Sequence, residues 1–299
     1  MAMVRSLHPS GEQYEIFFGD QRAVITEVGA TLREYWSGGR AVLDGFAVSE
    51  MCSGGRGQLL MPWPNRIRDG AYNAGGQRLQ LPINEPERGN AIHGLVRWPS
   101  WLPVEHTHDR IHLSHTLRPQ PGYPFLLQLA ADYALGPEGL RTTWSAHNLG
   151  DEPAPFGAGS HPYLRPLAGL VDRAELRIPA RSYLEVDERM NPTGRRLPVA
   201  STPYDFRTRR QVAGGVLDVC YADFDEPVLE FDGLRLAWDG NHHFLQVFSG
   251  DALEPERRRR GLGAEPMTCP ANAFNSGEGL VMLPPGHYRS GSWSISLLN

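Results

Sequence analysis

The sequence predicts an all-β fold, a large antiparallel β-sandwich with little helix. Apolar and polar residues alternate through many short segments, and a period of two places one face of each strand in a core. Helical periodicity over three turns is nearly absent. The 33 glycines and 25 prolines are spread along the whole chain, so they separate strands rather than mark one linker.

The domain organisation follows from the same spread of turn residues. The chain of 299 residues has no internal repeat of fixed period, no low-complexity segment and no convincing boundary. All-β sandwiches of roughly 200–250 residues commonly form one domain. We therefore expect a single domain over residues 1–299, and a split near Gly150 is the alternative.

Strands in the first half of the chain end at recognisable turns. The expected strands are Tyr14–Phe18, Ala23–Val28, Leu32–Trp36, Arg110–Leu117, Phe125–Leu135 and Leu140–His147. Gly38-Gly39 closes the third of these, and the residues from Gly136 to Gly139 connect the last two as a hairpin.

The pattern continues to the C-terminus. The expected strands are Val228–Phe231, Leu234–Trp238, Phe244–Phe248, Leu280–Leu283 and Trp293–Leu298. Asp232-Gly233 separates the first two and is the strongest short hairpin signal in the chain.

Composition excludes several classes of partner. The net charge is −5, and phosphate binding needs a basic face, so nucleic acid is not expected as a partner. Met1–Pro9 contains no apolar signal-peptide core, and no apolar run reaches membrane-spanning length. Three cysteines without a Cys-x-x-Cys spacing fit free thiols in a reducing compartment. We expect a cytoplasmic protein with no membrane partner.

Two residues stand out as candidates for acid–base chemistry. Glu265 precedes Pro266, which pushes the residue before it into an extended conformation, so the carboxylate is held on a stiff backbone. His161 lies between Gly-Ser and Pro-Tyr, and an imidazole can donate a proton and take it back near neutral pH. A solvated glutamate and a histidine with an ordinary hydrogen bond are the plain alternatives.

Loop residues of three further segments suit sugar binding. Asn65 and Arg66 follow a Pro-Trp-Pro sequence, and arginine presents a planar fork of donors that matches vicinal hydroxyls or a carboxylate. His93 precedes a glycine, and Asp218 or Asp223 could accept hydrogen bonds from hydroxyls. Each of these residues could instead stabilise a turn.

A metal site is not expected from the remaining histidines. They are His106, His108, His112, His115, His242 and His243. No cysteine or carboxylate accompanies them at the spacing of a structural zinc site. The basic run Arg257–Arg260 fits a solvated loop, with a role at a pocket rim as the alternative.

In this order on an all-β chain, five segments resemble the aldose 1-epimerase (galactose mutarotase) family. They are Asn65-Arg66, the residues Asn90 to Gly94 with His93, His161-Pro-Tyr163, Asp218, and Glu265-Pro266. The resemblance extends from Ala23 to the last strands.

This resemblance implies a galactose mutarotase-like supersandwich that binds a hexose as a monomer or homodimer, without cofactor or metal. Glu265 would remove the proton of the anomeric hydroxyl, and His161 would protonate the ring oxygen. The other sugar-binding residues would be Asn65, Arg66, His93, Tyr163 and Asp218. Asp251 stands near the position of a glutamine found in galactose-type members, and we expect it to replace that residue.

Four other functions stay open. A sugar-phosphate or sulfosugar 1-epimerase would need additional arginines, for which Arg97, Arg165 or Arg257–Arg260 could serve. A glycoside hydrolase would use Glu265 together with Asp218 or Asp251 as a carboxylate pair. A non-catalytic carbohydrate-binding protein could use the same pocket.

Overall fold

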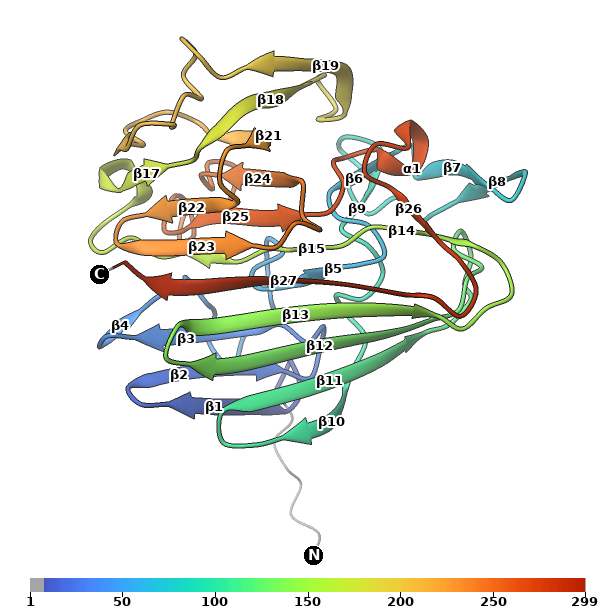
Figure 1. The fold of residues 1–299 in the computed structure, drawn as a ribbon, viewed down its shortest axis with the longest axis horizontal. Coiled ribbons are helices and arrows are strands. Elements are labelled where there is room, and N and C mark those ends of the chain that lie inside the picture. The colour runs from blue at the N-terminus through green and yellow to red at the C-terminus, as the bar shows by residue number, and fades with distance from the viewer. Residues whose placement is uncertain (1–7, 299) are drawn as a thin grey trace, which may run out of the picture.

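The computed structural model describes residues 8–298 and consists almost entirely of antiparallel strands (Figure 1). This part contains 27 strands, one four-residue helix, α1 (Ala273–Ser276), and one 3₁₀ helix (Val171–Arg173). The all-β prediction is confirmed. Residues 1–7, on which the expectation about a signal peptide partly depends, lie outside the described residues.

A nine-stranded sheet forms one large layer of the molecule. In spatial order its strands are β10 (Leu102–His106), β11 (Arg110–Leu117), β12 (Leu127–Gly136), β13 (Gly139–Asn148), β27 (Tyr288–Leu297), β23 (Leu234–Trp238), β22 (Val228–Phe231), β17 (Glu175–Arg177) and β20 (Arg210–Gln211). The last long strand of the chain, β27, therefore pairs with β13 on one side and β23 on the other. That pairing connects the two halves of the sequence, and the single-domain organisation stays a prediction.

An eight-stranded sheet carries or flanks three of the expected site residues, Glu265, Asp218 and His161. Along its main path lie β19 (Pro192–Pro198), β18 (Ala180–Val186), β21 (Asp218–Phe224), β24 (Phe244–Phe248), β25 (Leu262–Met267), β15 (Gly159–Ser160) and β5 (Leu59–Leu60). The short strand β16 (Tyr163–Leu164) also pairs with β25.

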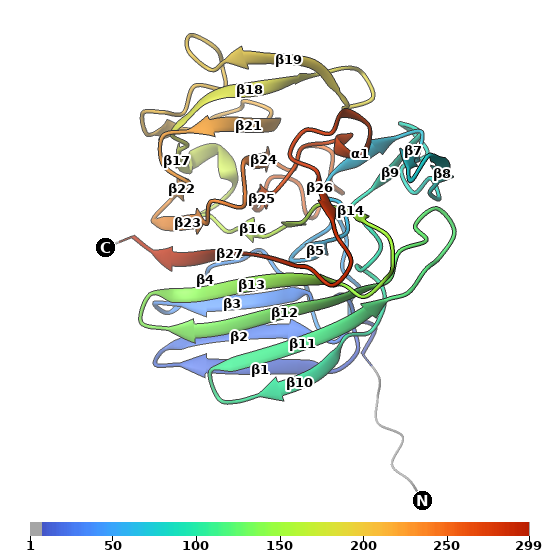
Figure 2. The ribbon, with the colours of Figure 1, turned by 45° about the vertical axis from the view of Figure 1, so that its right-hand side comes forward.

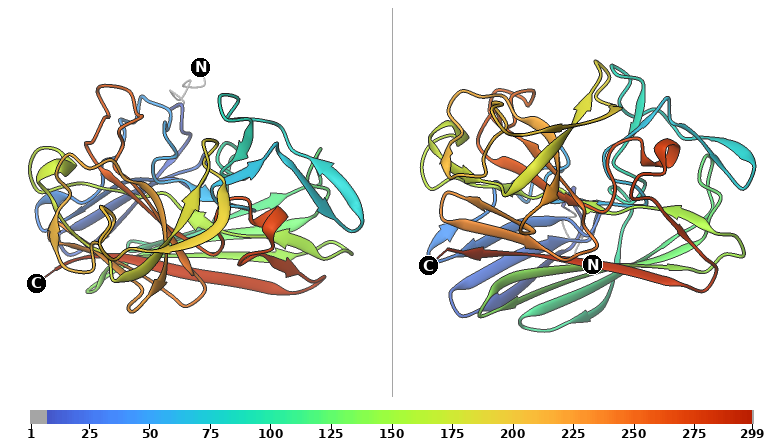
Figure 3. Two further views of the ribbon diagram at one scale, coloured as in Figure 1. Left: turned by 90° about the horizontal axis from the view of Figure 1, so that it is seen from above. Right: turned by 45° about the horizontal axis from the view of Figure 1, so that its top comes forward.

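Smaller sheets complete the fold. A four-stranded sheet contains β1 (Gln13–Phe18), β2 (Gln21–Thr26), β3 (Leu32–Ser37) and β4 (Arg40–Ala41). It lies behind β11–β13, and β1 and β2 contact β12 (Figure 2). Three pairs remain, β6 (Arg66–Arg68) with β9 (Asn90–Ile92), β7 (Ala71–Ala74) with β8 (Gln77–Gln80), and β14 (Ala154–Phe156) with β26 (Val281–Leu283). Helix α1 contacts β6 and β7 (Figure 3).

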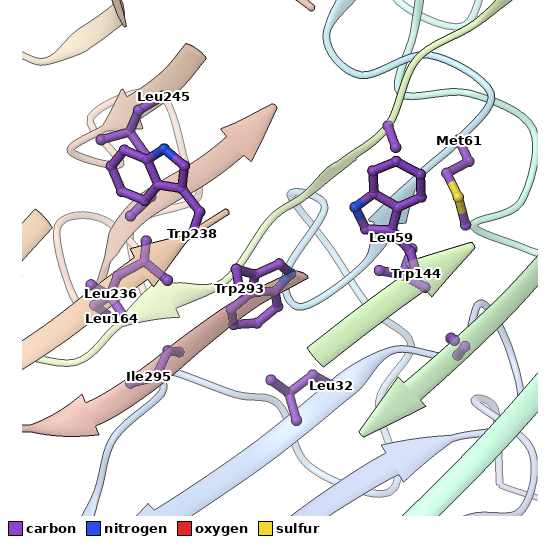
Figure 4. Close-up of a cluster of buried hydrophobic side chains, with 14 of the residues drawn as sticks. Leu32, Leu59, Met61, Trp144, Leu164, Leu236, Trp238, Leu245, Trp293 and Ile295 are labelled. Atoms are coloured by element: carbon purple, nitrogen blue, oxygen red, sulfur yellow. The ribbon is translucent and has the colours of Figure 1, made fainter. Parts of the chain in front are cut away.

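Side chains from the facing sheets fill one large apolar core. Figure 4 shows Trp144 and Trp293 of the nine-stranded sheet within a cluster that also contains Leu32 of the four-stranded sheet and Leu245 of the eight-stranded sheet. The indole Nε1 of Trp293 donates a 2.8 Å hydrogen bond to the hydroxyl of Ser160. The core thus fixes the backbone immediately before His161.

The pairing of β24 with β25 determines which of their side chains point away from the apolar core. Gln246 lies opposite Glu265, and Gln246 also lies opposite Cys220 of β21. Directly opposed residues point to the same face of a sheet, and their neighbours point to the other. Val247 and Ala264 are in the apolar core, so Gln246 and Glu265 share the opposite face.

The structure describes the cysteines and the long helices, on which the expectations about cellular compartment partly depend. The three cysteines are free and buried, as predicted. In the part of the chain that the structure covers, no helix is long and apolar enough to cross a membrane.

Candidate active site

A buried histidine–carboxylate pair forms the centre of the site. Nε2 of His161, in the link between β15 and β16, lies 3.2 Å from Oε1 of Glu265 on β25. The exposed fractions of the two residues are 4% and 3%. Within residues 8–298, the second carboxylate oxygen of Glu265 is buried and has no hydrogen-bond partner. A buried polar atom without a partner is costly, so this oxygen is available for a ligand.

Main-chain hydrogen bonds hold His161 at this position. Its amide donates to the carbonyl of Gln58 at 3.0 Å, and its carbonyl accepts from the amide of Gly57 at 2.8 Å. The carbonyl of Pro162 accepts from the amide of Ala264, the neighbour of Glu265, at 3.0 Å. The imidazole and the carboxylate are therefore connected through the backbones that carry them.

A stack of three side chains supports the far side of the imidazole. The His161 and Tyr163 rings are nearly parallel, with centroids 4.9 Å apart, and the Arg56 guanidinium lies 4.3 Å from the Tyr163 centroid. Arg56 pairs at 3.3 Å with Asp44, and both are buried. The Tyr163 hydroxyl donates to the carbonyl of Gly54 at 2.9 Å. Tyr163 thus supports His161, and its expected contact with sugar stays a prediction.

Gly55 permits the close packing of this stack. Its φ is +72°, and a Cβ at Gly55 would lie 2.7 Å from Cδ2 of His161. We expect Gly55→Ala to displace the imidazole and to lower kcat by roughly 10- to 100-fold, because a misplacement of about 1 Å is enough for such a loss. Steady-state kinetics, with far-ultraviolet circular dichroism to check folding, will measure the effect.

Gly76→Ala is the matched control for that variant. Gly76 has nearly the same φ, +74°, and a Cβ at Gly76 would meet no atom of residues 8–298 within 4 Å. Both substitutions carry a similar backbone strain of about 1 kcal/mol. Equal kinetic effects of the two substitutions would show that strain alone, rather than contact with His161, explains the loss.

Gln246 connects two of the expected sugar-binding residues. Its Nε2 donates to Oδ1 of Asp218 at 2.6 Å, and its Oε1 accepts from Nδ2 of Asn65 at 3.4 Å. Because Gln246 lies directly opposite Glu265 in the sheet, the amide, the two partners and the carboxylate occupy one face. Hydroxyl groups of a ligand can find both donors and acceptors there.

Arg66 is oriented by a buried carboxylate. Nε and Nη2 of Arg66 each donate to Glu85 at 2.8 Å, to separate oxygens, and Nη1 donates to Oδ1 of Asn65 at 3.2 Å. Asn90 donates to the same carboxylate at 2.8 Å. This two-point pairing fixes the plane of the guanidinium. Arg66 therefore both stabilises the loop and presents its Nη1 side toward the Asn65 network.

His93 and Asn65 have unusual backbones. Their φ values are +64° and +53°, in the left-handed region that residues with a Cβ seldom adopt. The His93 amide donates to the Asn65 carbonyl at 2.8 Å, and the His93 and His161 ring centroids are 5.4 Å apart in an edge-on arrangement. Strained residues of this kind cluster at functional sites. Here the strain brings a second imidazole beside the pair formed by His161 and Glu265.

Burial shifts the proton affinities of the pair in opposite directions. Burial, and then the positive charge of Arg56, lower the pKa of His161 to about 3. Burial, and then the negative charge of Asp218, raise the pKa of Glu265 well above its ordinary value. Burial also lowers the pKa of His93. The dry site therefore favours a neutral imidazole next to a protonated carboxyl group.

Comparison with known proteins places the chain in a family. The family model described as aldose 1-epimerase matches residues 13–296. The chain belongs to the aldose 1-epimerase family. It is 36% identical over 289 residues to the uncharacterized protein YihR of Escherichia coli, an alignment covering 95% of this chain and 92% of YihR. It is 30% identical over 170 residues to the galactose mutarotase of Mus musculus, covering 54% of this chain and 48% of that protein.

Solved structures of the aldose 1-epimerase fold superpose on nearly the whole chain. A GalM/aldose epimerase homologue from C. elegans has a TM-score of 0.84 at 20% identity, covering 96% of this chain and 99% of that one. Galactose 1-epimerase from Lactobacillus acidophilus has a TM-score of 0.77 at 22% identity, covering 94% and 92%. These structures confirm the galactose mutarotase-like fold, and the family makes the chain a carbohydrate epimerase.

One cluster in this aldose 1-epimerase family member has the composition of a metal site. Single ligand atoms of His93, His161 and Glu265 lie within 4.8 Å of one another, and two imidazoles with a carboxylate are donors of catalytic zinc sites. Arg56 and Arg97 both place positive charge near His161, which opposes binding of a dication. A site without metal stays a prediction.

Two other expected residues have partners of their own. Oδ1 of Asp251 accepts from Nη1 of Arg259 at 2.8 Å, and Ser249 donates to Oδ2 of Asp251. Asp223, the alternative to Asp218, binds Ser182 and Arg196. Asp218 is thus the aspartate that joins the Gln246 network. The expected sugar contact of Asp251 stays a prediction. The glutamine that lies directly beside Glu265 in the sheet is Gln246.

Sequence reasoning missed four residues of this family member's site. They are Gly55, Arg56, Glu85 and Gln246. Gln246 had a usable signal, since it is the lone polar residue in the apolar run Phe244–Phe248. The other three lie in loops whose approach to the site depends on the folded chain.

Proposed function

We propose that this chain interconverts the α and β anomers of a hexose by acid–base opening and closure of the ring. The observation that carries the proposal is the buried contact between Nε2 of His161 and Oε1 of Glu265. A reaction that runs in both directions needs one group that takes a proton while another gives one. Glu265 and His161 can exchange those roles.

Ring opening uses the pair with the proton on the imidazole. The Glu265 carboxylate removes the proton of the anomeric hydroxyl. The electron pair of that O–H bond forms the C1=O1 bond, and the C1–O5 bond breaks as O5 takes the proton from Nε2 of His161. The products are the open-chain aldehyde, a protonated Glu265 and a neutral His161.

Ring closure reverses each step on the other face of the aldehyde. Rotation about C1–C2 presents that face to O5. His161 takes back the O5 proton as O5 attacks C1, and Glu265 returns its proton to O1. Asn65, Arg66, His93 and Asp218 hold the other hydroxyls while the chain rotates.

The shifted proton affinities support this assignment. Burial favours a protonated Glu265 beside a neutral His161, and that arrangement accompanies the open-chain sugar. The ring form is accompanied by two charged groups, the Glu265 carboxylate and the protonated His161, and a dry site disfavours both charges. The environment thereby offsets part of the greater stability of the sugar ring.

The same shifts predict a broad pH range of activity. The active His161–Glu265 pair shares one proton. Activity therefore falls in acid, where the pair gains a second proton at His161, and in base, where the pair loses its proton from Glu265. Groups with ordinary pKa values would share one proton only between pH 4.5 and 6.5. The lowered pKa of His161, about 3, and the raised pKa of Glu265 extend that range at both ends.

We therefore expect kcat/KM to be nearly constant from about pH 4.5 to beyond pH 6.5, where a pair with ordinary pKa values would already lose activity. Exchange spectroscopy by NMR between the two anomers will measure it, after subtraction of the buffer-catalysed rate. A decline centred at pH 6.5, the ordinary value for histidine, would contradict the assignment of the shifted pair.

The function itself is tested by anomer exchange of glucose and galactose with the purified chain. Catalysed exchange supports the proposal. Release of reducing sugar from aryl glycosides would instead indicate a hydrolase that uses two carboxylates. Sugar binding without catalysed exchange would indicate a non-catalytic carbohydrate-binding protein.

A further inference from the structure

Arg56 places a buried positive charge behind the imidazole that the proposed reaction uses. The exposed fraction of Arg56 is 2%. Its guanidinium lies 4.3 Å from the centroid of the Tyr163 ring, and that ring stacks on the His161 ring with centroids 4.9 Å apart. One aromatic ring thus separates the guanidinium from the imidazole.

The Arg56 guanidinium is held mainly by charge. Its Nη1 donates to the carbonyl of Ser53 at 3.1 Å. Within residues 8–298, its Nε and Nη2 are buried and have no hydrogen-bond partner. Nη2 lies 3.3 Å from Oδ2 of Asp44. Replacement of such a buried ion pair by neutral residues often costs no stability, so stability alone does not explain why the pair is present.

Asp44 fixes Arg56 relative to the Tyr163 ring. The Asp44 amide donates to the Tyr163 carbonyl at 2.9 Å, so the backbones of the two residues are joined. The other carboxylate oxygen of Asp44, Oδ1, lies 3.5 Å from Nη2 of Arg260. A Cβ at Gly261 would lie 2.8 Å from Cβ of Asp44, which shows how tightly Asp44 is packed. The carboxylate therefore has little freedom to move away from Arg56.

Charged or titratable groups face His161 from each element packed against it. They are Glu265 on β25, His93 in the loop after β9, Tyr163 on β16, and Arg56 and Arg97 in two loops. Of the two arginines, Arg56 has the larger effect on the pKa of His161. The Tyr163 hydroxyl stays neutral, because burial raises its pKa, and it donates to the carbonyl of Gly54.

We propose that the Arg56–Asp44 ion pair is a positioning element of the reaction, which holds the His161 imidazole through Tyr163 and favours transfer of its proton to the ring oxygen. This inference rests on the proposed function. In the ring form Nε2 of His161 carries the proton, and the positive charge of Arg56 repels it. Once O5 has taken the proton, the imidazole is neutral and that repulsion is gone. Arg56 thus makes His161 a stronger acid for the step in which the C1–O5 bond breaks.

Arg56→Met removes the charge and keeps an apolar side chain of similar length. We expect kcat to fall by roughly 10- to 100-fold, because the imidazole loses part of its support. We also expect the midpoint of the decline of kcat/KM in acid to rise by roughly one pH unit, because His161 without the repulsion gains a second proton more readily. Exchange NMR between the anomers of glucose or galactose measures both quantities.

Arg33→Met is the matched control. Arg33 is also buried, but it lies on β3, and its guanidinium donates to Gln13 and to the carbonyl of Phe46. We expect this variant to keep the wild-type midpoint and a kcat within about 2-fold of wild type. A shift of the midpoint as large as that of Arg56→Met would overturn the inference, because loss of any buried arginine would then have the same effect.

Arg56→Lys separates the charge from the stacking. Lysine keeps the positive charge but lacks the planar guanidinium. We therefore expect a lower kcat with the wild-type midpoint. A midpoint that moves as far as in Arg56→Met would overturn the role of the charge.

Titration of the ¹⁵N-labelled imidazole nitrogens follows His161 without turnover, and the His161→Gln variant assigns its signals. We expect the His161 imidazole to gain its proton at a higher pH in Arg56→Met than in wild type. An imidazole that titrates alike in both would overturn the inference and leave the proposed function standing. Absence of catalysed exchange in wild type would overturn the proposed function, whatever the imidazole does.

The double variant Arg56→Met with Asp44→Asn removes both charges, and it takes the place of Arg56→Met if that variant does not fold. We expect its melting temperature to lie within a few degrees of wild type or above it, with kcat lowered and the midpoint raised. A purely structural pair would give a lower melting temperature and an unchanged midpoint. An unchanged midpoint in a folded double variant would therefore overturn the inference.

Discussion

Glu265→Gln should abolish nearly all catalysed anomer exchange while the protein still binds sugar. The amide keeps the shape of the carboxyl group but cannot remove the proton from O1. Loss of a general base lowers kcat by roughly 10²- to 10⁴-fold, and the residual rate reflects binding alone. Exchange NMR measures kcat, and calorimetry measures sugar binding. A variant with full activity would exclude Glu265 as the base.

Asp223→Asn is the control for loss of a carboxylate. Asp223 pairs with Arg196 and Ser182 outside the catalytic pair, so this variant should keep wild-type kcat.

Glu265→Gln should also change how the stability of the protein depends on pH. The folded chain binds the Glu265 proton more tightly than the unfolded chain, so the contribution of Glu265 to wild-type stability falls as pH rises above 4.5. We expect the melting temperature of Glu265→Gln, relative to wild type, to be higher at pH 8 than at pH 4.5.

His161→Gln should reduce kcat by a similar factor, roughly 10²- to 10⁴-fold, since the ring oxygen then lacks its proton donor. His243→Gln, at an exposed histidine, is the control and should have wild-type kinetics.

The double variant of His161 and Glu265 tests whether the two residues act as a unit. We expect it to be little slower than either single variant, because one proton transfer cannot proceed without the other. Fully multiplied losses would show that the residues act independently.

The sequence predicted those strands whose local pattern agrees with their place in the fold. Arg110–Leu117, Val228–Phe231, Leu234–Trp238 and Phe244–Phe248 match the observed bounds of β11, β22, β23 and β24. Strand β25 was not predicted as a strand, because Pro266 cannot donate to a sheet and prolines are depleted in central strands. The expectation of an extended, stiff backbone at Glu265 was nevertheless correct.

The site could be predicted only as far as single segments reveal it. His161 and Glu265 were recognisable from their Gly, Pro and Ser neighbours, and the structure brings them into contact. Arg56 and Glu85 were not, because a buried ion pair depends on loops that are distant in sequence. Asp251 and Tyr163 have partners within the fold that the sequence did not reveal, and their expected contacts with sugar stay predictions.

The pairing of Gln246 with Glu265 has a consequence for how this protein can vary. A one-residue insertion or deletion in β25 would exchange its two faces, placing Ala264 or Pro266 beside Gln246 and turning the carboxylate into the apolar core. Loops generally tolerate insertions and deletions better than the strands they connect. In this fold we expect loops to tolerate changes of length better than β24 and β25, whose register places Gln246 beside Glu265. Under the proposed mechanism, sugar preference can therefore diverge through the loops while the strand register keeps Glu265 in place.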